Sequence, residues 1–88
     1  MATVVVRHKV RNFSTWLKGH QERVNIFAPV VSSFKSFQDA GDPNSVLLVM
    51  EVSDMEKMAA IINDPKNQEL KANHTVIDPI TVSMQIDV

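Results

Sequence analysis

The sequence predicts an α+β protein in which two helical regions cover one face of a four-stranded antiparallel sheet. Three observations indicate this: residues 80–88 alternate apolar with polar side chains, residues 3–10 and 45–52 are rich in aliphatic residues, and the segments between repeat apolar residues at helical spacing. A chain of 88 residues with 44% hydrophobic residues is typical of a single small globular domain, residues 1–88.

Residues 3–10 are the first predicted strand, because valines dominate them and neither glycine nor proline interrupts them. Alternation places His8 on one face together with valines, and the opposite face also begins apolar. A helix is expected over residues 13–27, with Asn12 as its N-cap and charged residues such as Arg23 on its solvent side.

A hairpin is expected next in the chain. Residues 30–39 form a strand with loose alternation, residues 40–44 contain most of the strong turn formers, and residues 45–52 form the third strand. This third strand carries aliphatic residues on both faces, as the first strand does. These two strands are therefore predicted to be the central strands of the sheet.

The second helical region begins after Ser53, which is predicted to form a capping box with Glu56. An Asn-Asp-Pro sequence then interrupts the helix, and Asp64 is expected to cap a second short helix that ends near His74. The last predicted strand begins after Pro79, where apolar and polar side chains alternate most clearly.

The order strand, helix, strand, strand, helix, strand predicts a ferredoxin-like βαββαβ domain with both helical regions on one face. The other face would expose a group of apolar side chains to water: Val5, Leu47, Val49 and Phe37. We therefore expect a homodimer in which two sheets pack face to face.

The composition excludes several kinds of partner. A net charge of −1 gives no long-range field that would attract nucleic acid or an anionic membrane. The absence of cysteine excludes disulfides, thiolate metal sites and a cysteine nucleophile. No apolar run approaches the roughly 20 residues that span a bilayer. The start of the chain lacks a signal-peptide pattern, so a cytoplasmic protein is expected.

The three histidines are the candidate functional residues. His8 shares the face expected beneath the helices, where its imidazole could act as a general base or orient a ligand, or could be a hydrogen-bonded core residue. His20 interrupts the apolar side of the first helix. It could contact a ligand there, or it could be a partly exposed residue at the rim of that apolar side. His74 follows a helix end, where the helix dipole alone would favour a cation. Their spacing matches no compact metal motif, so no metal site is expected.

Phe13 and Trp16 are large aromatic residues on the first helix. They are most simply core residues, but side chains of this kind also form the walls of pockets for planar aromatic ligands. The sequence contains no glycine-rich phosphate loop, nucleophile elbow or HExxH motif. Nucleotide binding and the hydrolase chemistries of these motifs are therefore not expected.

Several short motifs, taken together, resemble those of the dimeric α/β-barrel superfamily, in its broad antibiotic-biosynthesis-monooxygenase-like group. They run along nearly the whole chain: His8-Lys9-Val10 before Phe13-x-x-Trp16, Asp42-Pro43-Asn44, the segment from Glu51 to Lys57, and Asp64-Pro65 followed by Glu69-Leu70-Lys71-Ala72. The resemblance implies a homodimeric barrel with a ligand cavity between sheet and helices in each subunit.

Members of this group include cofactor-independent oxygenases of polyphenolic substrates, haem-degrading enzymes and lactone isomerases. The oxygenase and haem-degrading branches often use an Asn, a Trp and a His. Here the segment from Leu70 to His74 resembles the one that carries the histidine, so the resemblance implies a functional role for His74. The tryptophan of those branches has no aromatic counterpart near Asp64.

The residues and the resemblance together lead to two hypotheses. The first is a cofactor-free enzyme, a monooxygenase or an isomerase/cyclase acting on a small aromatic or enolisable compound, with His8 and His74 as catalytic residues. Phe13, Trp16 and His20 would then contact the ligand. The second is a dimer without catalysis, structural or binding a small apolar or aromatic ligand. An enzyme is expected to bring at least two histidines toward one cavity.

Overall fold

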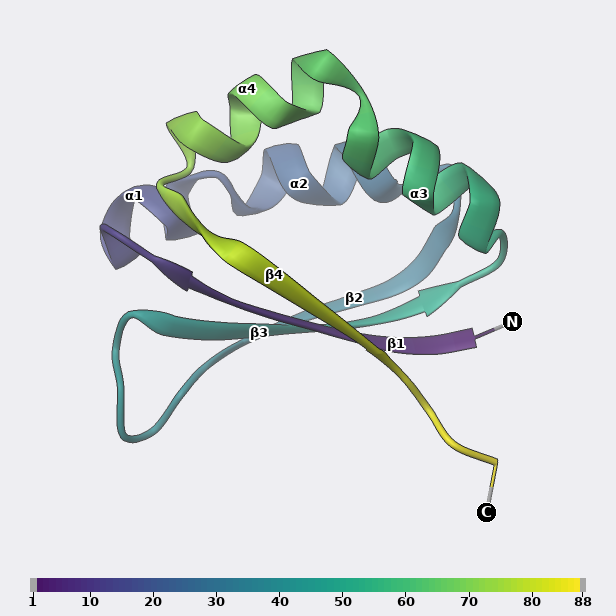
Figure 1. Ribbon diagram of the computed structural model, residues 1–88, viewed down its shortest axis with the longest axis horizontal. Helices are drawn as coiled ribbons and strands as arrows, with labels where there is room; N and C mark the ends of the chain where they lie inside the picture. Colours follow the sequence, from purple (N-terminus) through teal and green to yellow (C-terminus); the bar gives the residue numbers. More distant parts are fainter. Residues whose placement is uncertain (1, 88) are drawn as a thin grey trace.

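The computed structural model describes residues 2–87 and contains one four-stranded antiparallel sheet with all helices on one face (Figure 1). The strand order β2-β3-β1-β4 places β1 and β3 in the centre, and the predicted ferredoxin-like α+β fold is confirmed. The elements in chain order are β1 (Ala2–Val10), α1 (Phe13–Lys18), α2 (His20–Phe27), β2 (Val31–Gln38), β3 (Ser45–Val52), α3 (Met55–Asn63), α4 (Pro65–Asn73) and β4 (Val76–Met84).

The predicted helix over residues 13–27 is two helices, because α1 ends at Gly19 and α2 begins after it. The backbone N–H of Gly19 donates to the carbonyl of Trp16 at 3.1 Å. Its φ of −83° is open to any residue, so conformational freedom does not explain this glycine. The lack of space explains it, because a Cβ at this position would lie 2.6 Å from Nε2 of His74.

The predicted capping box at Ser53 is wrong by one residue. The N-cap of α3 is Asp54, whose side chain accepts a hydrogen bond from the backbone N–H of Lys57 at 3.1 Å. The Ser53 hydroxyl donates instead to the carbonyl of Val30, also at 3.1 Å. A contact between distant parts of the chain therefore takes the hydroxyl away from the helix end.

Two other predicted caps are confirmed. Asn12 accepts a hydrogen bond from the backbone N–H of Thr15, and Asp64 accepts one from that of Lys66, with Pro65 in the first turn of α4. The last strand begins at Val76 rather than after Pro79, since the segment from Val76 already pairs with β1.

The core lies between the sheet and the helices. The helix-facing side chains of both central strands are buried, and Trp16 and Met58 pack against them: Val4, Val6, Val10, Val46, Leu48, Met50 and Val52. The opposite side of the sheet, the outer face, carries Val5, Leu47 and Val49, all half-buried, and Phe37, which is 49% exposed. Register places Val5 beside Val49 and Phe37 beside Leu47, so these apolar side chains are contiguous.

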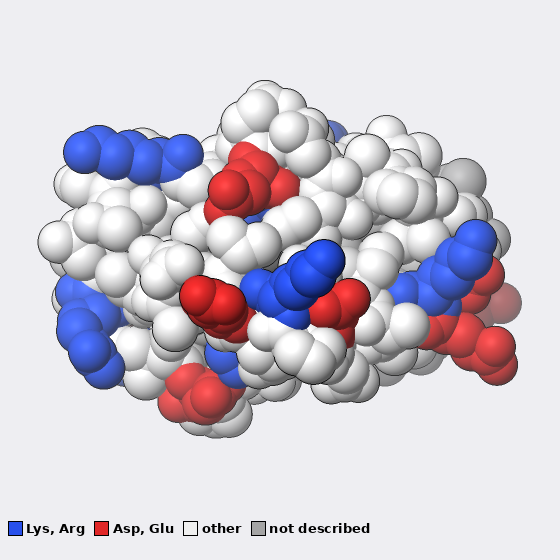
Figure 2. Space-filling model, turned by 90° about the horizontal axis from the view of Figure 1, so that it is seen from above, with Lys and Arg blue, Asp and Glu red and all other residues white. Residues whose placement is uncertain are grey.

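Figure 2 shows the molecule from above the helix layer, where Lys and Arg lie among Asp and Glu rather than in a patch of one sign. Within residues 2–87, no helix has the length and apolar character required to cross a membrane.

Candidate functional site

A cavity of about 110 Å³ lies between the sheet and helices α2, α3 and α4. Its wall is mostly aliphatic, and its volume is below the roughly 150 Å³ of an apolar cavity that binds benzene, so a ligand can be no larger than about one ring. The polar residues that line it come from β1, α2, α4 and the end of α4: His8, Arg23, Asn67, Lys71 and His74.

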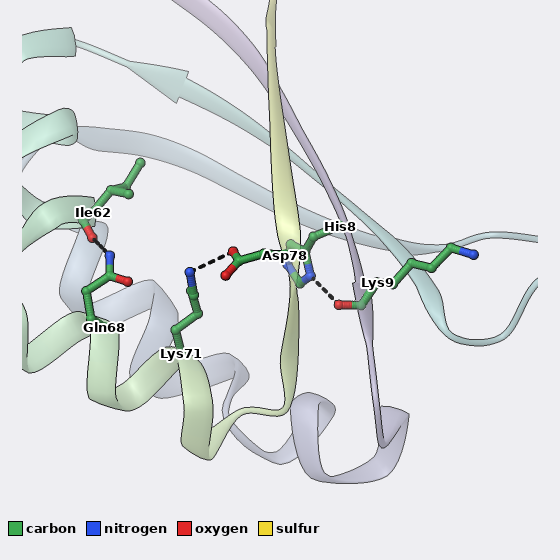
Figure 3. Close-up of polar contacts among 6 residues, drawn as sticks. All are labelled: His8, Lys9, Ile62, Gln68, Lys71 and Asp78. Atoms are coloured by element: carbon green, nitrogen blue, oxygen red, sulfur yellow. Dashed lines mark hydrogen bonds and ion pairs between the residues drawn. The ribbon is translucent and has the colours of Figure 1, made fainter.

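His8 is held in one tautomer by the backbone. Its side chain is 6% exposed, and Nδ1 lies 3.1 Å from the carbonyl oxygen of Lys9, a contact drawn in Figure 3. Because a carbonyl only accepts hydrogen bonds, Nδ1 carries the proton and Nε2 is left with its lone pair. Nε2 has no hydrogen-bond partner within residues 2–87. It is therefore free to accept a proton from a ligand.

Burial lowers the pKa of His8 below its ordinary value of 6.5, because an apolar environment disfavours the imidazolium. The hydrogen bond to the Lys9 carbonyl opposes this shift, and the positive charges of Arg23 and Lys71 add to it. His8 is consequently neutral near pH 7 and in the form that a general base requires.

This lowered pKa predicts a pH dependence of stability. Below about pH 6.5 the unfolded chain protonates His8 while the folded protein still keeps it neutral, so the free energy of unfolding should fall as the pH drops through this range. Urea unfolding at about pH 7 and about pH 5 measures the change. His8→Gln should show a smaller loss between the two pH values, and an identical loss in both proteins would contradict the prediction.

His74 and Arg23 form a hydrogen-bonded chain with Glu22. Nη1 of Arg23 donates to Nδ1 of His74 at 3.2 Å, and Nε2 of His74 donates to Oε1 of Glu22 at 2.8 Å. A guanidinium can only donate, so the His74 proton is on Nε2 and both ring nitrogens are engaged. His74 is thus arranged to position Arg23 rather than to take a proton from a ligand.

Arg23 is buried, with 7% of its surface exposed, and stacks on Trp16 with Cζ 4.1 Å from the ring centroid. Burial lowers the pKa of Arg23 to about 10, an effect that the negative charge of Glu22 partly opposes. The guanidinium remains charged near pH 7 and is a fixed cation in the wall of the cavity.

A second cation lies on the same wall. Nζ of Lys71 on α4 lies 2.8 Å from Oδ1 of Asp78 on β4, an ion pair drawn in Figure 3. The Lys71 side chain is 24% exposed and that of Asp78 is 71% exposed, so the pair has its carboxylate toward solvent.

The predicted site residues divide into two groups. His8 and His74 both line the cavity, so two of the three histidines converge as the enzyme hypothesis expects. His20 lies elsewhere, 5.8 Å from the Phe34 ring and 3.5 Å from the Ser36 hydroxyl. Trp16 lies under Arg23, behind the wall of the cavity, and the Phe13 ring centroid is 5.9 Å from that of Trp16. The residues that line the cavity therefore do not include Phe13, Trp16 or His20.

The expectation that Arg23 lies on the solvent side of its helix is wrong. Arg23 follows Trp16 by seven residues and precedes Phe27 by four, a spacing that places it on the buried side. The spacing therefore indicates that Arg23 is buried. The charge of the side chain favours the opposite prediction, because a charged side chain is seldom buried without a partner. Within residues 2–87, no three His, Asp or Glu side chains are grouped closely enough to hold a metal ion.

Solved structures share this fold over nearly their whole length. They include a putative antibiotic biosynthesis monooxygenase from Bordetella bronchiseptica (TM-score 0.77, 13% identity, 99% of this chain and 96% of that one). SnoaB, described as a cofactor-independent oxygenase from Streptomyces nogalater, matches with a TM-score of 0.75 and 12% identity over 99% of this chain and 94% of its own.

A further structure, described as an antibiotic biosynthesis monooxygenase, has a TM-score of 0.74 and 18% identity, with 100% of this chain and 99% of the other covered. No family model and no curated protein matches the sequence. The resemblance inferred from the sequence motifs is confirmed at the level of the fold: the chain has the ferredoxin-like α+β fold of the antibiotic-biosynthesis-monooxygenase-like structures.

Proposed function

We propose that the protein is a cofactor-independent enzyme that removes a proton from a small aromatic or enolisable compound bound in the cavity. The observation that supports this is the state of His8: Nδ1 is anchored to the backbone, Nε2 is unoccupied, and burial keeps the imidazole neutral. A buried neutral imidazole facing an apolar cavity is suited to general-base catalysis.

In the proposed step, Nε2 of His8 takes a proton from carbon, and the electron pair of the broken C–H bond remains on the substrate as an enolate. The positive charges of Arg23 and Lys71 on the same wall stabilise the negative charge that develops. His74 positions Arg23 through its hydrogen bond to Nη1. This step is common to an isomerisation and to a cofactor-independent monooxygenation.

The two reactions differ in what the enolate does next. Return of the proton to a different atom completes an isomerisation. Addition of O₂ to the carbanion gives a peroxide, which takes back the proton held by His8. Loss of water, which removes the second hydrogen of the same carbon and breaks the O–O bond, leaves a carbonyl group and completes a monooxygenation. A structure with this fold, SnoaB, is described as a cofactor-independent oxygenase, which supports the second route as chemistry that the fold can accommodate.

The wild-type protein provides the first test. It is incubated in D₂O with a panel of monocyclic ketones, lactones and quinols, under air and without oxygen, while NMR follows deuterium incorporation and an electrode follows O₂. Accelerated exchange without O₂ uptake supports the isomerase, and O₂ uptake supports the oxygenase. If a compound binds in the cavity but neither readout changes for any member of the panel, the alternative of a non-catalytic ligand-binding dimer is favoured.

We also propose that a second copy of the chain covers the outer face of the sheet. Contiguous apolar side chains on that face support this, because a small domain rarely leaves such a surface in water. A cytoplasmic location stays a prediction.

Val49→Asp should shift the protein from dimer to monomer, since it puts a charge at the centre of the proposed contact. Light scattering coupled to gel filtration measures the mass. Ala59→Asp adds the same charge on the exposed surface of α3 and should leave the mass unchanged. A monomeric wild-type protein at micromolar concentration would contradict the dimer.

A further inference from the structure

The guanidinium of Arg23 has an unused edge. Nε and Nη2 are buried and have no hydrogen-bond partner within residues 2–87, whereas Nη1 donates to His74. Nε–H and one N–H of Nη2 point in the same direction, on the side opposite Nη1, and together form the pair of donors that grips a carboxylate with two parallel hydrogen bonds. The unoccupied donors therefore have the geometry of a carboxylate-binding edge.

Two contacts hold this edge in place. The indole of Trp16 lies under the guanidinium, and Nδ1 of His74 accepts from its Nη1. Gly19 leaves room for this arrangement, because a Cβ there would lie 2.9 Å from Nη1. A side chain held in this way loses little conformational freedom when it binds a ligand.

The charges around the cavity favour an anion. Arg23 and Lys71 line it, and no Asp or Glu is among the lining residues within the described chain. The nearby carboxylates are engaged away from the free edge: Glu22 accepts from His74, and Asp78 pairs with Lys71. The charge of Arg23 is therefore buried with only indirect compensation, a situation that a bound anion would correct.

We propose that the cavity binds a small molecule that carries a carboxylate, and that the carboxylate accepts hydrogen bonds from Nε and Nη2 of Arg23. The proposal deepens the proposed function, on whose cavity it rests, by naming the ligand class as monocyclic or smaller carboxylic acids. Both nitrogens are shielded from solvent, and Arg23 lines the cavity, so binding requires lining side chains to move aside and open this edge to the ligand.

Benzoate and its neutral isostere benzamide test the proposal with the intact wild-type protein. Calorimetry should find that benzoate binds about 10- to 100-fold more tightly than benzamide, the usual effect of hydrogen bonds to a charged group. In ¹⁵N-labelled protein, the Nε–H resonance of Arg23 should move downfield with benzoate and stay in place with benzamide.

Variants assign the effect to the guanidinium. Arg23→Lys keeps the charge but loses the two-donor edge, and Arg23→Gln loses both, so benzoate binding should weaken in each. Arg11→Gln removes the same charge from an exposed position and should leave binding unchanged. Equal affinity for the two ligands, an unmoved Nε–H resonance, or no binding of benzoate at millimolar concentration would overturn the proposal. If benzoate binds in this way but neither deuterium exchange nor O₂ uptake is seen, the proposed ligand class is supported and only the proposed reaction is contradicted.

Discussion

Replacement of His8 by alanine is expected to lower the rate of the proposed proton abstraction by about 10²- to 10⁴-fold, the usual contribution of a positioned general base. No other neutral imidazole is available to take over, because both nitrogens of His74 are engaged and His20 lies outside the cavity. Steady-state kinetics with whichever compound the wild-type protein turns over measures the loss. The main effect should be on kcat.

Two controls make this result specific. His20→Gln removes an imidazole outside the cavity and should cost far less than His8→Ala. Added imidazole should restore part of the rate to His8→Ala, because it can occupy the space that the truncated side chain leaves. Equal losses in the two variants, or a His8→Ala protein with the wild-type rate, would contradict the assignment of His8 as the base.

Trp16→Ala is expected to lower the free energy of unfolding by about 3–5 kcal/mol, the usual cost of removing a large buried aromatic side chain. The Trp16 side chain is 1% exposed and lies between the Phe13 ring, the His8 ring and the guanidinium of Arg23. Its loss leaves a void and removes the surface on which Arg23 stacks. Against a total stability of about 5–15 kcal/mol, the variant should be marginally folded.

Trp16→Phe is the matched control for this prediction. Nε1 of Trp16 is buried without a hydrogen-bond partner within residues 2–87, so a phenylalanine removes an unsatisfied donor while it keeps most of the packing. Its cost should be clearly smaller than that of Trp16→Ala. Chemical unfolding is followed by far-UV circular dichroism, because both variants lack the single tryptophan of the chain. Equal destabilisation by the two substitutions would contradict this account of Trp16.

The strands could be predicted because their signal is local. Alternation along β1 and β3 is enough to identify the central strands and to place His8 beneath the helices. The caps at Asn12 and Asp64 are equally local, since each oxygen binds an N–H two or three residues away. These features are determined by interactions between residues that are close in the sequence.

The rest of the cavity depends on contacts between distant residues. Arg23 is buried because Trp16 and His74 accommodate its charge, and Gly19 is needed because the His74 ring leaves no room for a Cβ. Ser53 fails to cap its helix because Val30 is within reach. In each case the partner is supplied by the folded chain, and nothing near the residue in the sequence identifies it.

The hydrogen bonds that link Arg23 and Glu22 to His74 join residues 51 and 52 positions apart. Neither hydrogen bond can form before His74 reaches the α2 helix, so the first two helices alone do not fix the position of the guanidinium. A fragment that stops short of His74 should therefore hold Arg23 less firmly and bind benzoate more weakly, even if β1 to β3 associate.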